Sequence, residues 1–358
     1  TGAAPGSMAP PIRPAAVALP ARMGPSQAAG PSQNSGICST LRGVATDRVR
    51  TRSRERLERL AASHVSGEEL QREVVRELSR VVGFDRWCWP SADPVSLLPG
   101  PGLAEHNYGP HLPRALEQEY SGADVATKEQ AARGSSPAIC LSGESGGDLA
   151  RSPRWDETLS TAGIGDVAVL ACRDQFGCWA WLEMYRDHAD RPFSGLDLQL
   201  LAHLAPVLGG ALRHRVTAGP VDLAGAPEVS GVLLMDDQLA PLAETPATAA
   251  WFALLPAAAM FASWGILPPG VYAAATRVRS GRGPAARLMG RSAAGGWVQI
   301  EAARFGPTEP ADTAGMGEGI AVTVRAATPR EVFDLAARAH GLTARERQVV
   351  ARLVRGED

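Results

Sequence analysis

Lysine is nearly absent from this sequence. Of its 36 Lys and Arg residues only Lys128 is a lysine, while Gly and Pro number 38 and 28 and Ala is abundant. The codons of Arg, Ala, Gly and Pro are GC-rich, so we interpret this bias as a property of a GC-rich bacterial genome. The sequence also has no G-x-x-x-x-G-K-[ST] motif, which excludes that class of phosphate-binding loop.

Cysteine is scarce as well, with five residues and no C-x-x-C pair. An odd number without that spacing argues against a disulfide framework and against a zinc site, so we expect a reducing, cytoplasmic environment and no metal or other cofactor. No apolar run reaches the length of a membrane span, and we expect no membrane partner. The formal net charge of −2 calls for no strongly charged partner.

The chain is long enough for two or three domains. Its first residues are poor in large apolar side chains, which predicts disorder there. Composition and pattern then predict an α+β protein of two tandem antiparallel-sheet domains with flanking helices. The expected segments are 1–45 (disordered), 46–216 (first domain), 217–229 (linker), 230–327 (second domain), 328–341 (linking helix) and 342–358 (the start of a further helical domain).

The first domain is predicted from two capped helices and a hairpin. Ser66 and Glu69 form a capping box before an apolar stripe, and Ser194 opens a leucine-rich helix whose stripe is a candidate dimer surface, although core packing would use the same leucines. Two β-rich arms, Val167–Cys172 and Cys178–Tyr185, flank a polar turn. A short strand that includes Trp87 and Trp89 is expected to end at Pro90.

The second domain is predicted to have the order ββααβββ. A strand, an Asp-rich turn and a second strand fill 231–244, and two helical pieces follow near 246–255 and 270–279. The three strands after them are Ala286–Arg291, Trp297–Arg304 and Ile320–Arg325. A capping box at Thr328 and Glu331, with Pro329 at the first helical position, then opens the linking helix.

The last residues, Gly341 to Asp358, have the pattern of a helix start. Thr343 and Glu346 form a third capping box, and Val349, Val350, Leu353 and Val354 lie on one helical face. A helix this short is not stable alone in water, so its apolar face needs partners. One interpretation is a terminal helix that packs back on the body, and the other is the beginning of a further domain.

The string Gly341-Leu342-Thr343-Ala344-Arg345-Glu346-Arg347, followed by Leu353-Val354-Arg355-Gly356, resembles the first helix of the LuxR-type helix-turn-helix. Two earlier passages, Leu116–Gln130 and Gly146–Leu159, look like the GAF-like sensor domains of actinobacterial LuxR regulators, and residues 231–325 are similar to the PAS-like domain that follows them. The resemblance therefore implies a bacterial transcription regulator in which a GAF-like and a PAS-like sensor domain control DNA binding.

The same resemblance implies that the DNA-binding domain is truncated. A LuxR-type domain has four helices, and the scaffold and recognition helices would follow Gly356. Base readout needs a recognition helix in the major groove, so DNA is a partner of the full-length protein only. Carried over from the family, Thr343 and Arg345 are expected to contact the DNA backbone, and Glu346 to serve as a cap.

Two further patterns would suit a serine hydrolase and a metal site. Gly143–Gly147 fits G-x-S-x-G with Ser145 as nucleophile, but Pro153 follows too soon for the long helix that a nucleophile elbow requires. A surface loop is the simpler interpretation. His203 and His214 share a helical face but have no further ligand at metal-binding spacing. We expect no catalytic activity.

Four tryptophans are the candidate ligand-binding residues. Trp87 with Trp89, and Trp179 with Trp181, alternate along their strands, so each pair shares a face. If the two faces coincide they would line a cavity for an apolar or planar small molecule, and the alternative is an ordinary core. The sequence as a whole thus predicts the sensor region of a homodimeric LuxR-type regulator. The alternatives are a stand-alone small-molecule sensor or, less well supported, a hydrolase that uses Ser145.

Overall fold

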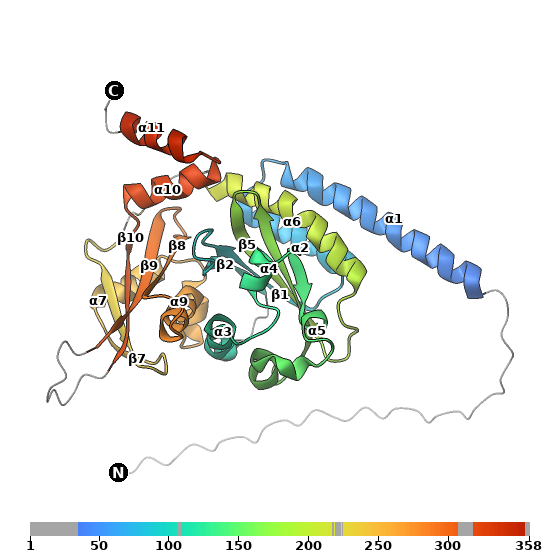
Figure 1. Ribbon diagram of the computed structural model, residues 1–358, viewed down its shortest axis with the longest axis horizontal. Coiled ribbons are helices and arrows are strands. Elements are labelled where there is room, and N and C mark those ends of the chain that lie inside the picture. The colour runs from blue at the N-terminus through green and yellow to red at the C-terminus, as the bar shows by residue number, and fades with distance from the viewer. Residues whose placement is uncertain are drawn as a thin grey trace, which may run out of the picture. The chain divides into compact units, whose positions relative to one another are not determined.

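The first sheet has five strands in the order β2-β1-β5-β4-β3, and every neighbouring pair is antiparallel (Figure 1). The computed structural model describes residues 35–105, 109–216, 218, 223, 225–306 and 318–354, with side chains from residue 48 to residue 353. The strands are β1 (Arg86–Ala92), β2 (Pro99–Glu105), β3 (Ala138–Cys140), β4 (Ile164–Asp174) and β5 (Gly177–Asp187).

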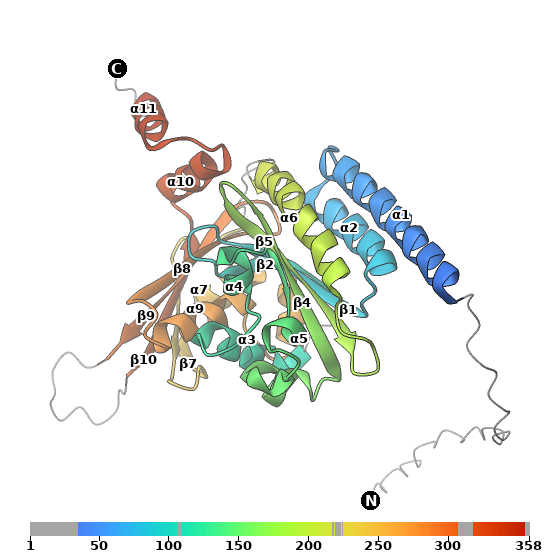
Figure 2. The same ribbon diagram turned by 45° about the vertical axis from the view of Figure 1, so that its right-hand side comes forward.

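Helices cover both faces of this sheet (Figure 2). Ala168 and Leu170 of β4 point to one side, where they pack with the helices α1 (Ser35–Ala61), α2 (Gly67–Val81) and α6 (Gly195–Val216). Val167 and Val169 point to the other side, as the period of two in a strand requires. That side carries α3 (Leu112–Ser121), α4 (Lys128–Arg133) and α5 (Leu141–Glu144), with the short turns η1 (Gly109–His111), η2 (Leu149–Arg151) and η3 (Trp155–Leu159).

The leucine stripe of α6 is part of the core. Leu200, Leu201, Leu204 and Leu208 are buried among the side chains of α2 and the first sheet. By length and composition α6 would also be able to cross a membrane, but these leucines already have apolar protein neighbours. The stripe is therefore not a free surface for a second copy of the chain.

The second sheet repeats the strand order of the first. Its order is β7-β6-β10-β9-β8, again antiparallel throughout, so that both domains have the order 2-1-5-4-3 when strands are counted within each domain. The strands are β6 (Gly231–Met235), β7 (Pro241–Glu244), β8 (Ala285–Arg291), β9 (Trp297–Phe305) and β10 (Gly319–Ala326). The helices between them are α7 (Pro246–Ala253), α8 (Ala258–Ser263) and α9 (Pro269–Arg279).

The two sheets belong to one compact unit, Asp47–Asp358, in which α9 packs against α3 (Figure 1). Arginines of α9 and of the turn after it pair with glutamates of α3 and α4: Arg279 with Glu117, and both Arg277 and Arg282 with Glu129. One apolar core runs through this junction and includes Leu116 of α3 and Val271 of α9.

Two further helices follow β10. Thr328 and Glu331 form a reciprocal capping box at the start of α10 (Pro329–Ala339), and Gly341 with φ +69° lies in the turn before α11 (Ala344–Val354). The α+β prediction of two antiparallel sheets with flanking helices is thus confirmed. The α10 cap lies at the predicted residue.

Several details differ from the sequence prediction. β1 continues past Pro90 to Ala92, because the proline lies at an irregularity of the β1–β2 pairing where its missing N–H is tolerated. The strands β2 and β3 were not predicted, and neither was the third helix, α8, of the second domain. Of the segment expected to be disordered, residues 1–34 lie outside the described residues, but residues 35–45 begin α1, so the prediction is wrong there. In the expected linker 217–229, residues 217, 219–222 and 224 lie outside the described residues.

Candidate functional site

Five charged side chains are buried together beneath the first sheet. Lys128 and Arg154 meet three carboxylates, and each of the five residues is at most 6% exposed. The carboxylates are those of Glu119 on α3, Asp124 in the following loop and Glu183 in the central strand β5. Buried charges are tolerated only when they are paired and hydrogen-bonded, so this cluster depends on its geometry.

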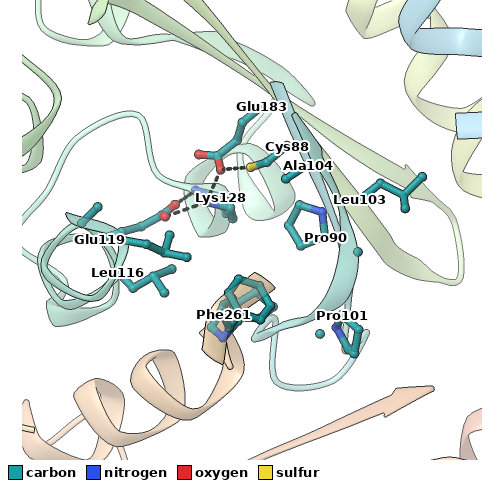
Figure 3. Close-up of a pocket in the computed structure, with 16 residues that line it drawn as sticks. Cys88, Pro90, Pro101, Leu103, Ala104, Leu116, Glu119, Lys128, Glu183 and Phe261 are labelled. Carbon is teal, nitrogen blue, oxygen red and sulfur yellow. Dashed lines mark hydrogen bonds and ion pairs between the residues drawn. The ribbon is translucent and has the colours of Figure 1, made fainter. Parts of the chain in front are cut away.

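Lys128 is placed by the start of α4. Thr127 and Gln130 form a reciprocal capping box, which fixes Lys128 at the first helical position. Its Nζ lies 2.6 Å from Oε2 of Glu119 and 2.7 Å from Oε2 of Glu183 (Figure 3). Its backbone N–H donates to Oε1 of Glu119 at 2.9 Å, and its carbonyl accepts from the indole of Trp181 at 3.1 Å.

Arg154 contacts all three carboxylates of the cluster. Its Nε lies 2.8 Å from Asp124, and its Nη1 lies 3.2 Å from Glu119 and 3.4 Å from Glu183. Ser152 donates to the second oxygen of Asp124 at 2.6 Å. With three carboxylates and two cations the cluster has a formal excess of one negative charge.

The cations set the protonation of the central carboxylate. Burial alone would raise the pKa of Glu183, but the attraction of Lys128 and Arg154 outweighs it and lowers that pKa to about 2. Burial likewise opposes the charge on Lys128, and Glu119 and Glu183 overcome it, so that the pKa of Lys128 is raised. Both groups are therefore ionised at neutral pH.

Cys88 of β1 and Tyr185 of β5 are further neighbours of Glu183. The Cys88 thiol donates to Glu183 Oε2 at 3.0 Å, and the Tyr185 hydroxyl donates to the same oxygen at 3.0 Å. Burial, and then the charge of Glu183, raise the pKa of Cys88 well above its usual value. A protonated thiol and a charged ammonium are both poor nucleophiles, so neither group is activated for covalent catalysis.

An apolar cavity of about 70 Å³ adjoins the cluster. Pro90, Leu103 and Leu116 line it from the first domain, Phe261 reaches it from α8 of the second, and Lys128, Glu119 and Glu183 form its polar end (Figure 3). An ammonium has three N–H donors, and its two ion pairs leave one donor without an acceptor among the described residues. The cavity thus offers one charged donor in otherwise apolar surroundings.

The size of this cavity limits what it can hold. An engineered cavity of about 150 Å³ is large enough for benzene, so the present shape suits a molecule of only a few heavy atoms, with a hydrogen-bond acceptor at one end. A larger ligand would need α8 to move, since Phe261 is the side chain that reaches the cavity from that helix.

The four predicted tryptophans do not meet in one cavity. Trp87 and Trp89 are buried on the side of α2 and α6, whereas Trp181 is buried on the opposite side of the sheet. Trp179 lines a different cavity, which lies between the two sheets. One reason is that β1 turns its tryptophans to the side of α2 and α6. The other is an irregularity in β5: Cys172 pairs with Ala180 and Arg173 with Cys178, so the pairing skips Trp179 and the period of two that predicted a shared face for Trp179 and Trp181 is interrupted.

Thr343 and Arg345 are both exposed. Thr343 caps α11, because its hydroxyl accepts from the N–H of Glu346 at 3.3 Å and its own N–H donates to the Glu346 carboxylate at 2.7 Å. These hydrogen bonds lower the pKa of Glu346. Arg345 remains a candidate for contact with the DNA backbone, because its side chain is exposed and its guanidinium forms no ion pair within the described part of the chain.

Ser145, the serine of the G-x-S-x-G string, is buried and hydrogen-bonded to the backbone. Ser145 follows α5, is 2% exposed, and its hydroxyl donates to the carbonyl of Ser142 at 3.4 Å. His203 contacts Glu58 at 3.0 Å on the exposed side of α6. Within the described residues, no group of three His, Cys, Asp or Glu side chains is placed to hold a metal ion.

The sequence contained one signal for the buried cluster. Lys128 is the single lysine of a chain that otherwise uses arginine, and it occupies a position where a compact ammonium fits between two carboxylates. GC-rich codons explain why arginine replaces lysine almost everywhere in the chain. They do not explain why a lysine is present at position 128. The carboxylates themselves are far apart in sequence, and only the fold brings them together.

Comparisons with known proteins give no family. No family model matches the sequence, and no curated protein matches it. Among solved structures, the chain is similar to a bacteriophytochrome from the photosynthetic bacterium R. palustris, with 12% identity, a TM-score of 0.30, and coverage of 86% of this chain and 75% of that one. It is also similar to the sensor region of a sensor histidine kinase, with 15% identity, a TM-score of 0.16, and coverage of 61% and 90%. Both scores are low, so neither likeness assigns a ligand or an output.

Proposed function

We propose that this chain is the sensor region of a bacterial transcription regulator of the LuxR type. In this proposal the first domain binds a small molecule beside Lys128, and the second domain and α10 pass the change to a DNA-binding domain that begins at α11. The observation that carries the DNA-binding part is the surface of α11, where Val349 is 52% and Leu353 is 66% exposed. Apolar side chains at helical spacing need a partner surface.

The sensing part of the proposal rests on the Lys128 cavity. A protein gains no stability from a donor left without an acceptor in an apolar cavity, and a ligand that supplies the acceptor removes that cost. Such a ligand would be small and mostly apolar, and would carry a carbonyl, ether or hydroxyl oxygen at one end. No catalytic step is part of the proposal.

A physical route from the first domain to α10 supports the transmission step. Arg213 of α6 pairs with Asp174 at 2.6 Å, lies over the ring of Phe176 at 4.4 Å, and donates to the carbonyl of Ala339 at the end of α10. Arg338 of α10 in turn donates to the carbonyl of Phe176 at 3.4 Å. The β4–β5 turn therefore touches the junction between α10 and α11.

The mechanism we propose is a shift between two arrangements of α10 and α11. A ligand changes such an equilibrium only by the difference between its affinities for the two states. Closing of Phe261 over an occupied cavity would supply that difference in the second domain. We also propose a homodimer in the cytoplasm, formed by a surface other than the buried stripe of α6.

The DNA-binding part is tested with the complete gene product. We expect the reading frame after Asp358 to encode a further basic amphipathic helix, and the complete product to shift DNA from upstream of its own gene in a gel. Arg345→Gln is expected to weaken binding similarly on all sequences and to reduce its salt dependence by about one phosphate contact. Arg330→Gln, an exposed substitution on α10, is the matched control. A complete product that binds no DNA would exclude this proposal and leave a stand-alone sensor.

The sensing part is tested separately on the chain itself. Thermal unfolding is measured with a panel of small ketones, ethers, alcohols and amides. A ligand of the cavity should raise the melting temperature by mass action. Ala115→Leu fills the cavity next to Leu116, because Ala115 lines it and is 2% exposed. Stabilisation that persists in this variant would place the ligand elsewhere.

A further inference from the structure

A second cavity, which we call the interdomain cavity, lies where the two sheets, α6 and α10 meet. Its volume is about 330 Å³, within the range of small-molecule sites. Trp179 and Leu103 line it from the first sheet, Met289 and Trp297 from the second, and Leu335 from α10. It therefore combines two aromatic side chains with a contact to the helix that leads to α11.

The interdomain cavity is lined by two carboxylates and two guanidinium groups, which differ in their partners. Glu68 and Asp93 line it, but Glu68 already accepts two hydrogen bonds from Arg72, at 3.0 and 2.7 Å. Asp93 accepts three backbone N–H groups, from Val95, Ser96 and Met289. Glu68 is thus paired with a cation, and both oxygens of Asp93 already accept hydrogen bonds from the backbone.

Within the described residues, neither of the two arginines of the cavity has a carboxylate partner. Arg215 donates there to three backbone carbonyls, those of Ser63, Val65 and Ala211. Arg291 donates Nη1 to the carbonyl of Ala218 at 2.7 Å, and its buried Nε has no acceptor among the described residues. Burial lowers the pKa of both guanidinium groups, as expected for cations without a neighbouring carboxylate.

The Arg291 guanidinium is held near an aromatic ring. It lies 5.2 Å from the centroid of Trp297. On the other side of the cavity the indole of Trp179 is fixed by a hydrogen bond of 3.1 Å to Asp174. Aromatic rings flanking an unpaired guanidinium suit a flat apolar group that ends in an anion.

We propose that the interdomain cavity binds a small aromatic carboxylate. The ring would lie among Trp179, Trp297 and Leu103, and the carboxylate would accept hydrogen bonds from Arg291. This cavity is distinct from the Lys128 cavity, although both have Pro101, Gly102 and Leu103 of β2 in their walls, and the proposal does not depend on the proposed output. Because Leu335 lines the cavity, a bound molecule would also contact α10 directly.

The test uses matched pairs of probes on the whole chain. Binding of benzoate, 1-naphthoate and indole-3-acetate is measured by isothermal titration calorimetry, each against its neutral amide. At least one acid is expected to bind at least about tenfold more tightly than its amide, since a hydrogen bond to a charged group is worth about that factor. Failure of all three acids to bind, or equal affinity of acid and amide, would overturn the proposal.

Two variants locate the site. Arg291→Gln should reduce affinity for the acid about tenfold, to the level of the amide. Arg287→Gln, on the same strand but paired with Glu301 at the surface, should bind as the unchanged chain does. Leu335→Trp fills the cavity from α10 and should abolish binding of both probes, which keeps the test decisive if Arg291→Gln folds poorly. Unchanged affinity in Arg291→Gln or in Leu335→Trp would refute the assignment.

Discussion

The two sheets have the same strand order and bury different chemistry. In the first, the central strand β5 carries Glu183, which is 1% exposed among Lys128, Arg154 and Glu119. In the second, the corresponding strand β10 buries Ile320, Val322 and Val324. One topology therefore accepts either an apolar core or an ionic one, and the ionic one requires partners from several separate segments.

The ionic cluster of the first domain has a cost in stability that the apolar core of the second domain avoids. An ionic core costs desolvation that apolar packing avoids, and replacing such a core by apolar residues is often neutral or stabilising. The first domain keeps it nonetheless, beside a cavity, and the second domain contributes the side chain of Phe261 to that cavity. In the proposed function, the first domain would recognise the ligand, and the second would supply packing and a route to α10.

The largest expected effect is that of Lys128→Met. This change leaves Glu119 and Glu183 with only Arg154 as a cation in a buried site, and breaking such a pair costs about 3–5 kcal/mol. The free energy of unfolding, measured by urea titration, should fall by that amount. In the second sheet, Val324→Ala should cost about 2 kcal/mol, from lost apolar burial alone.

A double substitution separates charge from packing in this prediction. Lys128→Met combined with Glu183→Gln removes one cation and one anion, so it should recover part of the stability lost in Lys128→Met. A Lys128→Met variant within about 1 kcal/mol of the unchanged chain would mean that the cluster contributes no more than a surface ion pair. The ionic core of the first sheet would then contribute no more to stability than the apolar core of the second.

The sequence specified the second domain better than the first. Both its hairpin and its last three strands lie within a residue or two of the predicted bounds, because β9 and β10 contain several β-branched or aromatic residues and an Asp-rich turn follows the apolar run of β6. In the first domain the hairpin β4–β5 was equally clear, but β2 contains two prolines and two glycines and has no strand-like pattern. Its pairing with β1 is imposed by tertiary contacts.

The candidate sites were less predictable than the fold. Three of the tryptophans serve the core on opposite faces, and a period of two along one strand does not tell which face is shared with another strand. The cluster around Lys128 draws its carboxylates from positions 119, 124 and 183, which no local spacing connects. By contrast, the caps at Thr328 and Thr343 are local interactions, and both lie at the predicted residues.

Acid should destabilise the chain through the first domain. The pKa of Glu183 is about 2 in the folded state, against an ordinary value of 4.5, so its stabilising contribution is complete above about pH 4.5 and is lost as the pH falls towards 2. The expected loss is about 3 kcal/mol. Urea titrations at pH 7, 4.5 and 3 should show about 2 kcal/mol of this loss by pH 3, since the rest is lost only at lower pH, and Glu183→Gln should flatten the dependence.

A second carboxylate, that of Glu331, also has a lowered pKa and contributes to the acid dependence of the free energy of unfolding. The hydrogen bonds from Arg325 lower the pKa of Glu331 at the start of α10 to about 2, but this pair is largely solvated and contributes less. Glu331→Gln should therefore change the acid dependence only slightly. An effect of Glu331→Gln equal to that of Glu183→Gln would place the acid sensitivity outside the first domain.

A smaller effect is expected at the turn between α10 and α11. Gly341 has φ +69°, and a Cβ at this position would overlap the ring of Phe176. Gly341→Ala should cost about 1 kcal/mol or more, and the cost should appear as faster hydrogen exchange in residues 329–341. Phe176→Ala in the same chain should relieve the overlap but not the backbone strain. Unchanged exchange in Gly341→Ala would show that α10 does not depend on the β4–β5 turn.

The smallest effect concerns the cap of α11. Thr343→Ala removes the hydroxyl that accepts from the N–H of Glu346, and loss of such a cap costs about 1 kcal/mol, or roughly a fivefold change in a local equilibrium. Because Val349 and Leu353 are exposed, α11 is held mainly by local interactions, so the change should speed hydrogen exchange in residues 344–354 and leave the melting temperature of the two sheets unchanged. Thr328→Ala removes the equivalent cap of α10, whose Ala337 is buried, and should disturb exchange less because packing also holds that helix. Equal effects at the two caps would mean that α11 is as firmly packed as α10, and the uncovered apolar surface that supports a DNA-binding partner domain would lose its significance.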